Sequence, residues 1–153
     1  MIELYKGDAK RIQHFCKVHS YAKLIAETEN VDKKCLFIIE AAALTHDIGI
    51  HFCEEKYGNC NGRLQEQEGP AIAERLLKKL GFDQEVSDRV QYLIAHHHTY
   101  NDIDAMDYQI LVEADFLVNI MEDSLTKEAA LKAYHNIFKT ACGKTICREM
   151  FDI

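Results

Sequence analysis

Residues 38–50, IIEAAALTHDIGI, decide how the rest of the sequence is interpreted. The stretch begins as an apolar run with the composition of a buried helix and ends on the adjacent pair His46 and Asp47, closely followed by Gly49. An imidazole and a carboxylate at the end of an apolar helix lose hydration unless a partner compensates both groups. A divalent metal ion compensates both at once, so the stretch predicts a metal site at the end of a core helix.

The composition is that of an ordinary globular domain. Hydrophobic residues make up 48% of the 153 residues and charged residues 28%, which is enough apolar material to bury a proper core. One proline and seven glycines leave little room for flexible linkers. We therefore expect a single domain over residues 1–153.

The charge and the cysteines limit the partners and the compartment. A formal net charge of −7 without any long Lys/Arg run disfavours long nucleic acid and anionic membranes as partners. A small anionic substrate remains compatible, because a bound dication reverses the local field. The first residues contain no apolar leader, no uninterrupted apolar run approaches 18 residues, and the six cysteines form no CxxC pair. These features predict a cytoplasmic protein with free thiols.

Helical periodicity dominates the chain, and no segment alternates strictly enough to be a strand. Polar residues 51–70 are expected to form a long functional loop after the His46–Asp47 pair, and Pro70 suits the first turn of the helix that follows. The sequence thus predicts an all-α, single-domain orthogonal bundle of five to seven helices. Its expected helices cover residues 8–29, 32–47, 70–81, 84–98, 106–122 and 127–140, with a short tail after Gly143.

Ionisable residues occupy positions where the helical period predicts core residues. His14 shares a stripe with Val18, whereas His19 lies roughly 140° further round the same helix. His97 and Asp115 also fall on apolar faces of their helices. One buried histidine alone is more often a hydrogen-bonded core residue than a ligand. Several such groups in one small domain are costly unless they share a partner, because each unpaired buried charge costs several kcal/mol. A shared metal ion removes that cost.

The pattern resembles the HD-domain metal-dependent phosphohydrolases over most of the chain. Residues 11–26, RxxHxxxVxxxAxxIA, are similar to the first helix of that family, and residues 41–49, AAALTHDIG, are similar to its namesake motif. Residues 113–115, EAD, are similar to the late helix whose aspartate completes the metal site. The resemblance implies an HD-like helical fold and four metal ligands: His14, His46, Asp47 and Asp115.

The resemblance leaves the number of metal ions open. Some HD proteins bind a second ion between the HD pair and the last aspartate, and Glu68 with His97 and His98 stands where those ligands would fall. Several dinuclear members have a histidine where this chain is expected to have Glu68. A carboxylate is able to ligate instead, and Glu66 competes with Glu68 for the role. The alternative is that both glutamates belong to a polar helix start.

The groups that bind and turn over substrate are less well defined by the sequence. Some family members carry Glu or Lys three positions after the HD aspartate, where this chain has Ile50. Lys56 and Arg63 are candidates to hold phosphate oxygens, with ordinary solvated loop charges as the alternative. His97 or His98 could protonate the leaving oxygen if a second metal does not occupy them.

Mixed imidazole and carboxylate ligands suit Fe, Mn, Co, Ni or Zn, with one ion per chain and a second left open. The resemblance implies hydrolysis of a nucleotide or another small phosphate ester by attack of metal-bound hydroxide on phosphorus, with Asp47, His97 and His98 as catalytic candidates. Two other hypotheses are a dinuclear iron oxygenase of the HD type and a non-catalytic module that binds a nucleotide or a metal. The sequence does not define the oligomeric state.

Overall fold

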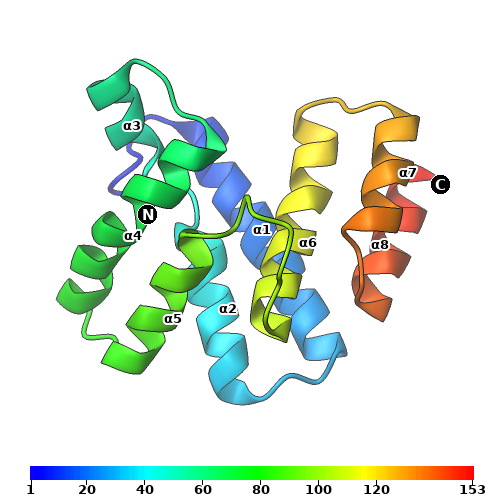
Figure 1. Ribbon diagram of the computed structural model, residues 1–153, viewed down its shortest axis with the longest axis horizontal. Coiled ribbons are helices and arrows are strands. Elements are labelled where there is room, and N and C mark those ends of the chain that lie inside the picture. The colour runs from blue at the N-terminus through cyan, green and yellow to red at the C-terminus, as the bar shows by residue number, and fades with distance from the viewer.

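The structure is a computed structural model that describes residues 1–153, and it contains helices and connecting turns without any strand (Figure 1). The predicted all-α helical bundle is confirmed. Only residues 46–49 separate the second helical segment from the third, and counting these two as one interrupted helix gives seven. The segments are α1 (Ala9–Thr28), α2 (Lys33–Thr45), α3 (Ile50–Tyr57), α4 (Gly62–Lys79), α5 (Gln84–Ile94), α6 (Met106–Glu122), α7 (Lys127–Asn136) and α8 (Ala141–Phe151).

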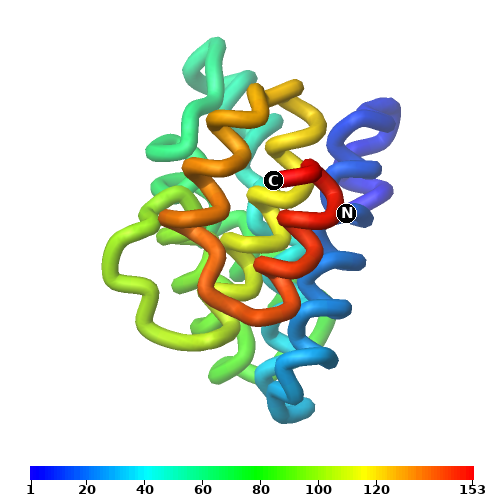
Figure 2. The backbone as a smooth tube through the Cα atoms, turned by 90° about the vertical axis from the view of Figure 1, so that its right-hand side faces the viewer, coloured from blue at the N-terminus to red at the C-terminus, as the bar shows by residue number.

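Helices α1, α2 and α6 form the centre of the bundle. Helix α1 packs against α2 and α6, α2 also packs against α5 and α6, and α4 pairs with α5. Helices α7 and α8 lie on the outer side of α6, away from α4 and α5 (Figure 1), and Figure 2 shows them side by side at the front. Twelve of the 17 residues of α6 are buried, and they include the polar residues Asp107, Gln109, Glu113 and Asp115.

Side-chain caps fix where the first two helices begin. The Asp8 carboxylate accepts a hydrogen bond from the backbone N–H of Arg11, and the Asp32 carboxylate accepts from the N–H groups of Lys34 and Cys35. Such caps satisfy backbone donors that have no partner within the helix. The predicted helices over 8–29 and 32–47 agree with α1 and α2 to within two residues.

The loop predicted over residues 51–70 is wrong, because α3 and the first half of α4 occupy most of it. Gly58 ends α3 in the left-handed conformation at φ 72°, and the Asn61 side chain caps α4 by accepting from the N–H of Leu64. Gly58 and Asn61 are therefore helix caps, and several of the polar residues, such as Glu54, Glu55 and Lys56, lie on exposed helix faces. Pro70 lies inside α4 and not in its first turn.

The predicted helix over 127–140 is also wrong at its end, since α7 stops at Asn136 and α8 replaces the expected tail. The cause is the buried Glu113 carboxylate of α6. It accepts hydrogen bonds from the backbone N–H groups of Lys139 and Thr140 and from the Thr140 hydroxyl. The Thr140 hydroxyl in turn accepts from the N–H of Gly143 and caps α8. A long-range contact therefore sets this helix boundary.

Segment Lys33–Tyr57 is long and apolar enough to cross a membrane by length and composition alone, with a mean hydropathy of 1.4. Of its most apolar window, 56% is buried inside the protein. The turn at 46–49 interrupts the segment, and α2 packs against three other helices. These features fit the core helix of a soluble protein.

Gly143→Ala should destabilise the protein, although alanine is ordinarily the better helix former. A Cβ at this position would lie 1.9 Å from Glu113 Oε2 and 2.7 Å from Thr140 Oγ1. We expect a loss of about 2 kcal/mol or more in the free energy of unfolding, measured by urea denaturation. Thr145→Ala, an exposed change in the same helix, should cost about 0.5 kcal/mol or less. Equal stability of the two variants would contradict the close packing of Glu113 against α8.

Candidate metal centre

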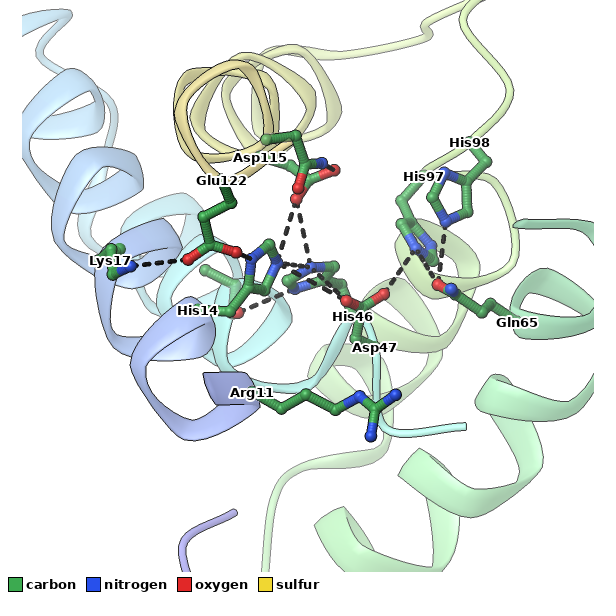
Figure 3. A network of polar contacts seen from close by, with 12 residues as sticks. Arg11, His14, Lys17, His46, Asp47, Gln65, His97, His98, Asp115 and Glu122 are labelled. Carbon is green, nitrogen blue, oxygen red and sulfur yellow. Dashed lines mark hydrogen bonds and ion pairs between the residues drawn. The ribbon is translucent and has the colours of Figure 1, made fainter. Parts of the chain in front are cut away.

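Three parts of the chain bring the predicted ligands together: α1, the turn after α2, and the middle of α6. The Nε2 atoms of His14 and His46 are 3.3 Å apart. Asp115 Oδ1 lies 3.3 Å from His14 Nε2 and 3.5 Å from His46 Nε2. Asp47 Oδ2 lies 3.6 Å and 3.5 Å from the same two nitrogens. Figure 3 shows these four side chains pointing toward one another.

The hydrogen bonds of the Nδ1 atoms determine which tautomer His14 and His46 adopt, and therefore whether Nε2 faces the centre with a lone pair. His46 Nδ1 lies 3.0 Å from the carbonyl oxygen of Ala43, and His14 Nδ1 lies 3.0 Å from Glu122 Oε2. Both partners only accept hydrogen bonds, so each Nδ1 carries a proton. In the neutral rings the Nε2 lone pairs then face the carboxylates and each other, which is the arrangement of ligands around a cation.

The Asp115 carboxylate gives a second sign of a missing positive partner. Its Oδ2 accepts a hydrogen bond from Asn119, but Oδ1 is buried and has no hydrogen-bond partner. A buried carboxylate oxygen without a donor is costly. This oxygen points at the two Nε2 atoms, and the set of two imidazoles and two carboxylates is typical of ligands for a first-row divalent metal. The residues therefore fit a metal ion.

The pKa values show how the centre balances charge without an ion. Burial opposes the charged form of His46, but Asp47 and Asp115 outweigh burial and raise its pKa to about 9. Burial likewise opposes the Asp47 carboxylate, but His46 and His97 lower its pKa to about 2. The pKa of Asp115 falls below its ordinary value because His14 and His46 outweigh its burial. In the metal-free protein, a proton on the imidazoles therefore supplies the positive charge.

A second group of donors lies on the other side of Asp47. Asp47 Oδ1 is 3.4 Å from His97 Nε2, and Asp47, His97 and His98 are close enough together to hold an ion. His97 Nδ1 lies 2.8 Å from the carbonyl oxygen of Ile94 and carries the proton there. Gln65 Oε1 lies 3.3 Å from His97 Nε2 and 2.9 Å from His98 Nε2. Asp47 thus directs one oxygen to each group.

The residue that faces His97 and His98 from α4 is Gln65, and the structure does not bring Glu68 to them. The Glu68 carboxylate accepts from Lys56 Nζ at 3.1 Å and from the Tyr57 hydroxyl. Sequence reasoning missed Gln65 because it started the helix at Pro70. With α4 starting at Gly62, Gln65 falls four residues before buried Gly69, on the inner face.

Glu66 also contacts this region, but through hydrogen bonds and not as a candidate ligand. Its Oε1 accepts from the backbone N–H of His98 and from the Thr99 hydroxyl, both at 3.0 Å. Burial and the neighbouring His97 lower the pKa of His98 to about 4. His98 is therefore neutral at pH 7. The predicted helix over 84–98 ends early, at Ile94, and these histidines lie in the turns after α5.

The remaining candidates are not members of the two donor groups. Lys56 is engaged by Glu68, and Arg63 is exposed on α4 without an ion pair. His19 pairs with Glu40 at 3.1 Å, between α1 and α2, and takes no part in either group. This agrees with the preference for His14 over His19 on the stripe of α1.

Arg11 lies on α1, one turn before His14, and is not among the candidates from the sequence. Its NH1 lies 2.6 Å from Asp8 Oδ2 and its NH2 lies 2.6 Å from Glu54 Oε1. The Tyr5 hydroxyl donates to the backbone carbonyl of Asp47 at 2.8 Å. Burial and the Asp47 carboxylate raise the pKa of Tyr5 well above its usual value, and Arg11 opposes that rise. Figure 3 draws Arg11 in the same view as Asp47, with no contact between the two side chains.

Fold and centre together define a class: an all-α protein whose helices bring imidazole and carboxylate donors to one buried point. The sequence profile of the family described as HD domain matches residues 11–141, which is most of the chain. The chain belongs to the HD-domain family, whose members are usually metal-dependent phosphohydrolases. No curated protein and no solved structure matches it.

Replacing a ligand should remove the metal. We expect His14→Ala and Asp47→Ala to lose most bound metal, measured by elemental analysis after purification without chelators. Each variant should also lose the stabilisation that added metal gives the native protein, about 3 kcal/mol at a hundred times the Kd. His19→Ala should keep its metal. Loss of metal from His19→Ala with retention in His14→Ala would reverse the assignment on α1.

The stability of the metal-free protein should depend on pH. Because the folded-state pKa of His46 is about 9, above its usual 6.5, its contribution is complete below pH 6.5 and disappears as the pH rises through 9. We expect the free energy of unfolding in EDTA to fall over this range, by at most about 3 kcal/mol. Protein saturated with Ni²⁺ should not show this decline, since the ion replaces the proton. Parallel pH profiles with and without Ni²⁺ would contradict the proton–metal competition.

Proposed function

We propose that this protein hydrolyses a nucleotide or another small phosphate ester with a divalent transition metal held by His14, His46, Asp47 and Asp115. The unpartnered Asp115 Oδ1, facing two Nε2 atoms, is the observation that carries the proposal. A divalent ion at such a site polarises a phosphoryl oxygen and makes a water molecule nucleophilic near neutral pH. Membership of the HD-domain family supports the same reaction class.

The chain's own residues would orient the reacting groups. Asp47 belongs to both donor groups, so it fixes the distance between them. His97, with its Nδ1 proton held by the carbonyl of Ile94, presents Nε2 toward Asp47 and Gln65. His98 is neutral at pH 7 and lies with Nε2 close to Gln65 Oε1. Both His97 and His98 therefore remain candidates for protonating the leaving oxygen.

Arg11 is a further candidate to bind a phosphate oxygen, because it precedes His14 by one turn of α1. Asp8 and Glu54 each hold one of its terminal nitrogens, so the guanidinium is oriented and still has N–H groups to donate. Lys56 and Arg63, the candidates from the sequence, remain alternatives. Lys56 would have to leave Glu68 first.

We infer one firmly held ion per chain and a weaker second position at Asp47, His97 and His98. Glu68 is directed elsewhere, and the amide oxygen of Gln65 carries no charge, so the second group attracts a transition metal less strongly. A dinuclear iron oxygenase remains the second candidate, because Asp47 directs one oxygen to each group. We also propose a cytoplasmic setting, in keeping with six cysteines that are all free thiols.

Metal stoichiometry and a substrate screen test these alternatives. Protein purified without chelators should contain about one transition metal ion per chain and should release phosphate or nucleoside products from phosphomonoesters or phosphodiesters with Mn²⁺, Co²⁺, Ni²⁺ or Fe²⁺. Two irons per chain with substrate-dependent oxygen consumption would support the oxygenase. Binding of a nucleotide without turnover of any ester would indicate a non-catalytic module and contradict the hydrolase.

Arg11→Gln should raise KM for the ester found in that screen by about tenfold or more, because a charge-assisted contact to phosphate is lost. Metal content should stay as in the native protein. Lys56→Ala and Arg63→Ala, measured in parallel, should change KM less than Arg11→Gln. If Lys56→Ala or Arg63→Ala raises KM more than Arg11→Gln does, that residue and not Arg11 contacts the phosphate.

A further inference from the structure

The outer hydrogen bonds of the buried histidines are of two kinds. His46 and His97 direct Nδ1 to backbone carbonyls three residues earlier in the chain, those of Ala43 and Ile94. These contacts come with the local backbone and need no particular side chain. His14 alone directs Nδ1 to a carboxylate, that of Glu122, which lies 108 residues away. The orientation of His14 therefore depends on one side chain of α6.

Glu122 is well placed to hold this ring. Its side chain is only 12% exposed, its Oε2 lies 3.0 Å from His14 Nδ1, and its Oε1 lies 2.7 Å from Lys17 Nζ. Lys17 follows His14 by one turn of α1 and fixes the carboxylate from the other side (Figure 3). Glu122 also follows Asp115 by seven residues, which places both on one face of α6.

We propose that Glu122 is a positioning residue for the metal centre. It keeps the Nδ1 proton on His14 and orients Nε2 toward the ion, and it makes Nε2 a more basic metal ligand. The inference rests on the metal centre of the proposed function. A carboxylate behind a metal-binding imidazole fixes the tautomer and increases the basicity of the ligand. Helix α6 then supplies both a ligand, Asp115, and the group that orients another ligand.

A second cluster of histidine, lysine and glutamate, also on α1, provides a matched control for this contact. His19 Nε2 lies 3.1 Å from Glu40 Oε1, and Lys23 Nζ lies 3.1 Å from the same oxygen. This cluster has the same three residue types as His14, Lys17 and Glu122, and it also joins α1 to a neighbouring helix, but it contains no donor of the metal centre. Glu40→Gln therefore removes the same charge from the same kind of contact without touching the site.

The experiment compares native protein, Glu122→Gln and Glu40→Gln. The Kd for Co²⁺ is measured by competition with a chelator, together with the visible spectrum of the Co²⁺ protein and the melting temperature of each metal-free variant. We expect Glu122→Gln to weaken Co²⁺ binding about tenfold to a hundredfold and to shift the Co²⁺ spectrum. Glu40→Gln should change neither, although both variants lose similar inter-helix contacts.

Three outcomes would overturn the proposal. If Glu122→Gln binds Co²⁺ as tightly as native protein, Glu122 serves only to join α1 and α6. If both variants weaken binding equally, the effect is general loosening of α1. If native protein binds no Co²⁺ at all, both the metal centre and this inference fail, whereas the first two outcomes leave the proposed function intact.

Discussion

Nitrogen lone pairs and carboxylate oxygens that converge in a buried volume repel one another unless a positive charge lies between them. That constraint governs the point where α1, α6 and the turn after α2 meet. Protonated His46 meets it in the metal-free protein, as its raised pKa shows. A divalent ion meets it better, because one ion also provides the partner that Asp115 Oδ1 lacks. The rest of the bundle keeps these donors from moving apart.

Helix α6 contributes much to holding the donor side chains together. It holds Asp115 at the centre, Glu113 against the loop before α8 and Glu122 behind His14. Each carboxylate is bound from a different direction, so α6 is fixed in position by polar contacts as well as by apolar packing. Buried carboxylates are costly unless they are fully satisfied, and this helix has satisfied them everywhere except at the Asp115 oxygen that faces the centre.

The sequence was informative wherever local patterns decide the structure. Periodicity separated His14 from His19, capping residues located the starts of α1 and α2, and the His46–Asp47 pair indicated where the donor side chains converge. It was uninformative where distant contacts decide. The end of α7 depends on Glu113 in α6. The place of Gln65 depends on α4 beginning eight residues before Pro70, and no local pattern distinguishes a neutral amide near two histidines from a surface glutamine.

The hydrogen bond of the Tyr5 hydroxyl restricts the movement of the backbone at the metal centre. By donating to the Asp47 carbonyl, it ties the segment ahead of α1 to the tight bend that carries the two consecutive donors. Its ring is buried, contacts Phe15 edge-on and lies against His51. The residues before α1 therefore hold the turn at residues 46–49 in place. Removing them would free the backbone of Asp47, although all four candidate ligand side chains would still be present.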